Sequence, residues 1–187
     1  MTDQEEHIVI KNVVAGNAHA FASLVNTYKD RTVLLAYNIL LNQEDAEEVA
    51  QDAFIKAYTA LHSFKADARF ATWLYRIVVN TALNKKKLKK HYAVEITASL
   101  GDVLSADVHT TQITGEHRKH IQLALQTLND KERLCIALYY LNELSVEEIR
   151  ELTGLSIANI KVLLYRGRKN LYSALHKQLK SEITTII

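Results

Sequence analysis

Proline is absent from this sequence of 187 residues, and glycine occurs only five times. A fold made of many short strands needs frequent turns, and turns favour these two residue types. Long helices with few interruptions fit this composition better, because alanine, leucine, glutamate and lysine are strong helix formers and are plentiful here. We therefore predict an all-α fold.

Cysteine occurs once, at Cys135, which excludes an internal disulfide and a cysteine-rich zinc site. Cys135 lies in an apolar helical run, so we predict a core residue rather than a nucleophile. His117 and His120 are spaced for sharing a metal, but the sequence suggests no third ligand. The sequence also lacks a Walker loop and the glycine pattern of dinucleotide-binding proteins. We expect no metal, no cofactor and no enzymatic activity.

Long apolar runs are also missing, since none approaches the ~18 residues that a membrane-spanning helix requires. The first residues are polar and acidic, unlike a secretory signal. We predict a cytoplasmic protein without membrane insertion. The net charge of +2 excludes a uniformly basic coat for nucleic acid, although it leaves room for local basic patches.

Charge and periodicity divide the chain into three parts. Residues 93–113 contain three acidic residues and no Lys or Arg, and they show no sustained helical stripe. Their content of serine, threonine, alanine and aspartate is typical of a flexible linker. We predict two small helical domains, residues 1–92 and 114–187, joined by this linker.

Apolar residues recur at helical spacing in three segments of the first domain. One helix carries Phe21, Leu24 and Tyr28 on a single face. A second begins near Asn42, a good N-cap followed by acidic residues that favour the helix dipole. A third spans about residues 70–88, with an apolar face of Phe70, Trp73, Leu74, Ile77, Thr81 and Leu88, and a polar face of Thr72, Arg76, Asn80 and Asn84.

Capping signals dominate the second domain. An apolar stripe of Ile121, Ala124, Leu125 and Leu128 predicts its first helix. Asn129 with Glu132, and Ser145 with Glu148, have the spacing of capping boxes. Gly154 stands where a left-handed residue ends a helix, and Ser156 can cap the next one.

The segment from Ser145 onward therefore reads as a helix-turn-helix, held together by Ile149, Leu155, Ile160 and Leu163. Residues 157–180 contain six Lys or Arg residues and no acidic ones. Lys161, Tyr165 and Arg168 share one face of the final helix. These features favour insertion into a DNA major groove, while a solvated basic helix is the alternative.

Three further patterns fit recognition of nucleic acid or a partner. Five lysines within residues 85–90 suit phosphate contact, although lysines also stabilise a helix C-terminus. The aromatic stretch of residues 64–80 could stack unpaired bases, although aromatics at helical spacing are usually core residues and Trp73 is expected to be one. Acidic residues 44–52 form either a solvated helix face or a docking surface for a basic partner.

Taken in order, these patterns resemble the RNA polymerase sigma factors of the extracytoplasmic-function type, within the sigma-70 family. The block DAEEVAQDAF at 45–54, then TWLYRI at 72–77 and Asn80, resemble sigma region 2. Leu134, Glu148, residues 154–156 and the RGR at 166–168 resemble region 4. Agreement of both regions in order makes the resemblance specific.

The resemblance implies a protein that binds core RNA polymerase and directs promoter-specific initiation, while the polymerase does the chemistry. Region 2 would dock an acidic helix onto the clamp helices of the polymerase β′ subunit, through Asp45, Glu48, Gln51 and Asp52. It would also engage the −10 element, where a base flips out of the stack, through Phe64, Lys65, Phe70, Arg76, Asn80, Lys86 and Lys87.

Region 4 would sit on the β flap with its last helix in the major groove of the −35 element. The residues expected there are Ser156, Asn159, Lys161, Tyr165, Arg166, Arg168 and Lys169, because arginine and lysine suit guanine edges and phosphates and asparagine suits adenine. The resemblance also makes an anti-sigma factor a partner to expect. A stand-alone helix-turn-helix regulator and an adaptor protein that mimics sigma contacts are the alternative functions.

Overall fold

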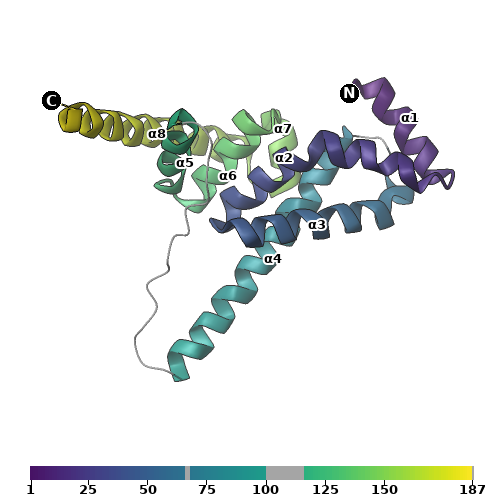
Figure 1. Cartoon of the computed structure of the whole chain (residues 1–187), viewed down its shortest axis with the longest axis horizontal. Coiled ribbons are helices and arrows are strands. Elements are labelled where there is room, and N and C mark those ends of the chain that lie inside the picture. Colours follow the sequence, from purple (N-terminus) through teal and green to yellow (C-terminus); the bar gives the residue numbers. More distant parts are fainter. Residues whose placement is uncertain (66–67, 100–115, 187) are drawn as a thin grey trace. The chain divides into compact units, whose positions relative to one another are not determined.

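The computed structural model describes residues 1–65, 68–99 and 116–186 of the chain. Helices account for nearly all of these residues, and the described segments contain no strand. The contacts divide the chain into two units, Met1–Val108 and His109–Ile187. The predicted all-α fold is confirmed (Figure 1). Among the described helices, none combines the length and apolarity that crossing a membrane would require.

The first unit is a bundle around three packed helices, α2, α3 and α4, with a shorter helix α1 that contacts α2. Its elements are α1 (Asp3–Val14), η1 (Ala18–Ala20), α2 (Phe21–Leu40), α3 (Gln43–Ala60), η2 (Leu61–Ser63) and α4 (Phe70–Ser99). In Figure 1, α2 and α3 lie alongside each other and α4 continues well past them.

A tight reversal joins α2 to α3. Leu41 adopts a left-handed conformation with φ 57° and ends α2. Asn42 then caps α3, because its side chain accepts a hydrogen bond from the Asp45 backbone N–H at 2.8 Å. The predicted start of the second helix is therefore confirmed, and the carboxylates of its first turn lie where the helix dipole favours them.

The core of this unit largely follows the predicted apolar stripes, and Leu88 and Trp73 depart from them most clearly. Leu24, Val49 and Leu74 are fully buried, as expected. Leu88 was expected on the apolar face of the third helix but is 59% exposed. At this level of α4, Lys85 and Lys89 are the residues that face α3. Trp73 is only half-buried, so the prediction of a core residue is only partly correct.

Helix α4 extends into the linker predicted at residues 93–113. The helix continues to Ser99, so the first part of that segment is helical rather than irregular. Residues 100–113 lie outside the described part of the chain. The exact domain boundaries therefore stay a prediction.

The second unit consists of α5 (Glu116–Gln126), α6 (Asp130–Ile136), the π-helical turn η3 (Ala137–Leu141), α7 (Val146–Thr153) and α8 (Ile157–Ile186). Its core contains Leu138, Ile149 and Ile160, all with no measurable exposure. Ile121, predicted on the buried face of α5, is instead 45% exposed. The periodicity of apolar residues predicted helix α5 correctly, but it did not predict how many of these residues other helices cover.

Helix α6 packs closely against α8 at Gly167. A Cβ atom added to this buried glycine would lie 2.8 Å from Cγ1 of Ile136. Glycine in a helix interior costs about 1 kcal/mol of stability relative to alanine. The close approach of α6 to α8 explains why glycine is nevertheless present, because a larger residue would clash with Ile136. Beside this contact, the Asn170 amide donates to the Glu132 carboxylate at 3.0 Å.

That hydrogen bond modifies the predicted capping box of α6. Asn129 does cap the helix, since its side chain accepts from the Glu132 backbone N–H at 3.0 Å. The Glu132 carboxylate accepts a hydrogen bond from Asn170 of α8. The cap thus helps to join α6 to α8.

Candidate nucleic-acid interface

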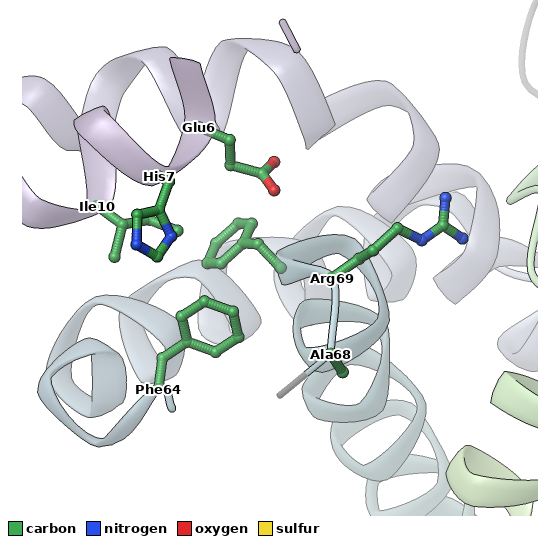
Figure 2. A pocket seen from close by; sticks show the side chains of 7 residues that line it. Glu6, His7, Ile10, Phe64, Ala68 and Arg69 are labelled. Carbon is green, nitrogen blue, oxygen red and sulfur yellow. The ribbon is translucent and has the colours of Figure 1, made fainter. Parts of the chain in front are cut away.

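A cavity of about 210 Å³ opens between α1 and the segment that precedes α4. Glu6, His7 and Ile10 line it from α1 (Figure 2). Phe64, Ala68, Arg69 and Phe70 line it from the other side. The structure therefore brings the two predicted phenylalanines of the −10 set together at one cavity, with part of α1 facing them.

Phe64 and Phe70 form an aromatic cluster with Trp73. The Phe64 and Phe70 rings meet edge to face with centroids 5.8 Å apart, and Trp73 lies 5.3 Å from Phe64 and 5.6 Å from Phe70. Phe70 is buried, whereas Phe64 is half-buried. A partly exposed ring that is held by two other aromatic rings is suited to stacking an unpaired base.

The polar face of α4 continues from this cavity. Arg76, Asn80 and Asn84 are exposed, while Thr72, predicted on the same face, is buried. Lys56 of α3 contacts the buried face of the same helix, where its Nζ donates to the hydroxyl of Thr81 at 3.1 Å. Sequence reasoning missed Lys56, since an isolated lysine in a helix gives no signal until the neighbouring helix is placed.

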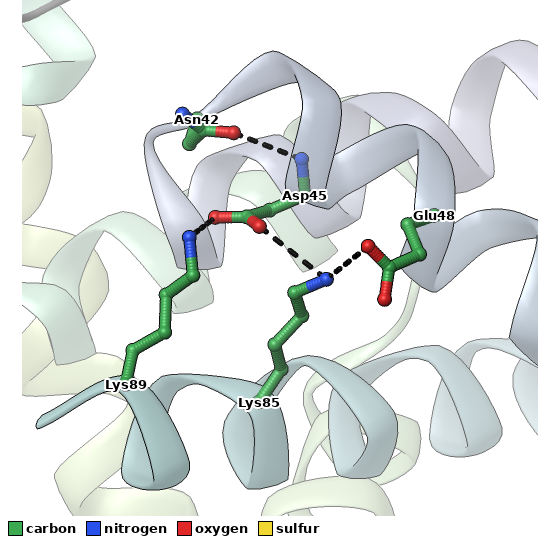
Figure 3. A network of polar contacts seen from close by, with 5 residues as sticks. All are labelled: Asn42, Asp45, Glu48, Lys85 and Lys89. Carbon is green, nitrogen blue, oxygen red and sulfur yellow. Dashed lines mark hydrogen bonds and ion pairs between the residues drawn. The ribbon is translucent and has the colours of Figure 1, made fainter. Parts of the chain in front are cut away.

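The lysine run at residues 85–90 is divided by its contacts with other helices. Lys85 Nζ lies 2.6 Å from a Glu48 oxygen and 3.3 Å from an Asp45 oxygen, and Lys89 pairs with the second Asp45 oxygen (Figure 3). Half-buried Lys86 donates to the Ile39 carbonyl at 3.2 Å. Lys87 is exposed, as is Lys90.

These ion pairs change the charge of the α3 surface. Burial acts to lower the pKa of Lys85, but hydrogen bonds from its ammonium to Glu48 and Asp45 outweigh burial and raise that pKa. The Asp45 side chain is 11% exposed, whereas that of Glu48 is 65% exposed. Of the four predicted polymerase-binding residues, Asp45 is thus largely enclosed within the unit, and Gln51 and Asp52 are exposed.

The helix-turn-helix has the geometry that its capping signals predict. Ser145 and Glu148 form a complete capping box on α7, and Gly154 ends that helix with φ 72°. The Ser156 hydroxyl then accepts from the Asn159 backbone N–H at 3.2 Å and caps α8. Ile149 and Ile160 are fully buried between the two helices, as predicted.

The predicted −35 residues lie on exposed positions of α8 and at its N-cap. All seven are exposed: Ser156, Asn159, Lys161, Tyr165, Arg166, Arg168 and Lys169. Arg168 additionally donates to the hydroxyl of Tyr140 at 3.2 Å, so η3 positions that guanidinium. Ser156 already uses its hydroxyl as a cap acceptor.

Cys135 is fully buried, and burial raises the pKa of its thiol to about 11. A protonated, enclosed thiol is inert, in agreement with the predicted core role. Where the chain is described, no three His, Cys, Asp or Glu side chains gather as metal ligands would. The side chain of His117 lies outside the described part.

The contribution of α1 to the cavity was not predicted from the sequence. The signal was present, because Thr2 and Glu5 have capping-box spacing and Ile10 and Val13 share a helical face. In the structure Thr2 and Glu5 form the complete box, and the hydrogen bonds from Thr2 lower the pKa of Glu5. Nothing local, however, indicates which segment α1 packs against.

Comparison with known proteins gives two family matches. Sigma-70 region 2 matches residues 24–91, and sigma-70 region 4 matches residues 118–171. The chain is 35% identical to the ECF RNA polymerase sigma factor SigW of Bacillus subtilis (strain 168), covering 91% of this chain and 95% of SigW. It is 30% identical to the ECF RNA polymerase sigma-E factor of Escherichia coli (strain K12), covering 90% and 92%.

The fold is similar to that of a solved sigma factor. The structure of RpoE in complex with the anti-sigma factor NepR from Bartonella quintana aligns with a TM-score of 0.69 at 22% identity, over 83% of this chain and 96% of RpoE. At this identity the likeness concerns the fold.

Proposed function

The chain belongs to the sigma-70 family of RNA polymerase sigma factors, in the extracytoplasmic-function group, and from this premise we propose how its surfaces divide promoter recognition among them. Like its relatives, it is an initiation factor that directs promoter-specific transcription with RNA polymerase, and it is not an enzyme. We place it in the cytoplasm, where that polymerase works.

The cavity beside Phe64 receives an unstacked base of the −10 element. The half-buried Phe64 ring, held by contacts with Phe70 and Trp73, supplies a stacking surface. Removing a base from the stack costs a few kcal/mol, and a preformed aromatic wall offsets part of this cost. The exposed Arg76 and Asn80 continue this surface along α4.

The phosphate contacts of this region come from the exposed lysines. Lys65 and Lys87 are exposed and belong to this set, and Lys90 is a further exposed cation. Lys86 would have to leave the Ile39 carbonyl to join them, so it contributes less than Lys87.

The α3 surface docks onto the polymerase through Gln51, Asp52 and Glu48, in the complementary manner of an acidic surface meeting a basic partner. Asp45 contributes indirectly, because its carboxylate is held by Lys85 and Lys89. It fixes α4 against α3 and so sets the position of the docking helix relative to the −10 surface.

Helix α8 occupies the major groove of the −35 element. Its N-terminal turn presents Asn159 and Lys161 near a capped helix end, where base edges are usually read. Arg166 and Lys169 contact phosphates farther along, and Tyr140 holds Arg168 in place. An anti-sigma factor that covers these exposed surfaces is a further proposed partner, of the kind seen with RpoE.

One observation carries this proposal. A single chain combines a correctly capped helix-turn-helix whose α8 face is exposed and cationic with an aromatic-walled cavity next to an exposed polar helix face. A stand-alone DNA-binding regulator would have no use for the second feature.

The test is run-off transcription with core polymerase over a pool of promoter fragments, with and without the protein. New transcripts are expected only with the protein. Arg76→Ala with Asn80→Ala should abolish them, and Lys29→Ala, which removes an exposed cation of α2, should leave them unchanged. Tight DNA binding by the chain alone, without new transcripts, would contradict the proposal.

A further inference from the structure

Helix α1 lies outside the part of the chain that matches sigma region 2, which begins at residue 24. It nevertheless forms one wall of the cavity that Phe64 and Phe70 line from the other side. The proposed function assigns a base to this cavity but gives α1 no role. The side chains of α1 that line the cavity can therefore influence which base the cavity binds.

The wall formed by α1 is held in place by buried contacts. Ile10 and Val13 are buried at 7% and 8% exposure. The Glu6 carboxylate, also buried, accepts a hydrogen bond from the Tyr28 hydroxyl at 2.5 Å. The Tyr28 ring in turn contacts Phe70, with centroids 5.6 Å apart. The same tyrosine therefore links α1 to the aromatic side of the cavity.

The chemistry of the wall favours a base over a phosphate. The α1 side of the cavity consists of Glu6, His7 and Ile10 and offers no Lys or Arg to hold a phosphate, whereas the guanidinium that lines the cavity, that of Arg69, comes from the opposite side. Figure 2 shows the imidazole of His7 on the α1 side of the cavity and the Phe64 ring opposite it. A planar base lying on Phe64 would present its edge toward α1, where an imidazole nitrogen can donate or accept a hydrogen bond.

We infer that α1 completes the pocket for the unstacked −10 base and that His7 is a specificity-determining residue that contacts this base. The inference rests on the proposed function and deepens it. The cavity volume of about 210 Å³ leaves room for a single base between the two walls. His7 is exposed and is not needed for the core, so its replacement leaves the fold intact.

The test measures open-complex formation by the holoenzyme on promoters that carry each of the four bases at each −10 position. The wild-type holoenzyme is expected to discriminate among bases at the captured position. His7→Ala should lower that discrimination by about fivefold, the size expected for the loss of one typical hydrogen bond. Discrimination at the other −10 positions and at the −35 element should stay unchanged.

Two variants make the outcome decisive. Phe64→Ala, which removes the stacking wall, should lower discrimination at the same position. His19→Ala removes an exposed histidine of η1 that does not line the cavity, and it should change nothing.

If Phe64→Ala lowers discrimination at one position and His7→Ala does not, the inference about α1 is wrong and the proposed function stands. An equal loss at every position with His7→Ala also overturns the inference, since it indicates a general effect on folding. If the wild-type holoenzyme shows no discrimination within the −10 element, the proposed function fails and this inference fails with it.

Discussion

The individual lysines near the end of α4 have different environments although they follow one another in the sequence. Lys85 and Lys89 neutralise Asp45, and Lys86 donates to a backbone carbonyl of α2. Lys87 is exposed. A run of like charges therefore combines structural residues with residues available to DNA, and substitutions can separate the two groups.

Replacing Lys87 by alanine should weaken promoter binding by the holoenzyme to a similar degree for all promoter sequences. One phosphate contact fewer should reduce the slope of log affinity against log salt concentration by about 1. Thermal unfolding should be unchanged, because Lys87 is exposed. Salt titrations of binding to a labelled promoter measure the slope.

Lys85→Ala is the matched comparison for Lys87→Ala. It should lower the stability of the protein and leave the salt dependence of promoter binding nearly unchanged. The variant removes one ion-pair partner from the enclosed Asp45 carboxylate and another from the exposed Glu48 carboxylate. We expect a loss of about 1–2 kcal/mol in stability, between the values for exposed and fully buried pairs, with little change in salt slope. A reduced slope with unchanged stability would mean that Lys85 contacts phosphate instead.

The thiol of Cys135 should resist alkylation by iodoacetamide in the folded protein and react after unfolding in urea. Burial raises its pKa to about 11, so the reactive thiolate is scarce at neutral pH. Because folding raises this pKa, its contribution to stability is fully present below the pKa of the unfolded thiol, and it is lost as pH rises toward 11. Rapid labelling of the native protein at neutral pH would contradict this burial.

Among the elements, α1 shows how a short helix depends on its surroundings. Twelve residues are marginal for an isolated helix in water, even with a complete capping box. Buried Ile10 and Val13, together with the Glu6–Tyr28 hydrogen bond, supply the tertiary contacts that stabilise it. The helix and the cavity wall that it forms are therefore properties of the folded unit.

The contact between α6 and α8 should be sensitive to one methyl group. Gly167→Ala gains about 1 kcal/mol of helix propensity but places a Cβ 2.8 Å from the buried Ile136 side chain. Overpacking of this kind costs typically 1–3 kcal/mol, so we expect a net loss of about 1 kcal/mol. Urea unfolding measures this loss.

Ser173→Ala is the control for that substitution, since it introduces alanine at an exposed position of the same helix. It should leave the stability unchanged or raise it slightly. If Gly167→Ala were equally harmless, α6 and α8 would have room between them that the structure does not show.

For the whole molecule, a net charge of +2 should make the free chain a weak DNA binder. Affinity for DNA depends strongly on phosphate neutralisation, and several of the lysines and arginines are already engaged within the protein. Promoter affinity measured by fluorescence anisotropy at physiological salt should be high for the holoenzyme and low for the isolated chain. Tight, salt-resistant binding by the isolated chain would contradict this expectation.

The sequence by itself determined the helices, their caps and the helix-turn-helix, and it placed the exposed residues of α8 correctly. These features depend on local rules, because a cap such as Ser145 acts over one helical turn and an apolar stripe repeats along one element. The resemblance to sigma factors depended on the same local blocks and led to the family that the comparisons then confirmed.

Only the tertiary structure decided which charged residues are available and where α1 lies. The contacts of Asp45 with Lys85 and Lys89, of Glu6 with Tyr28, and of Gly167 with Ile136 join residues far apart in the chain. The exposure of Leu88 and Ile121 likewise depends on which face of each helix its neighbours cover. Such properties arise from the packing of one helix against another. The periodicity of apolar residues within a single helix does not indicate which other helix packs against it.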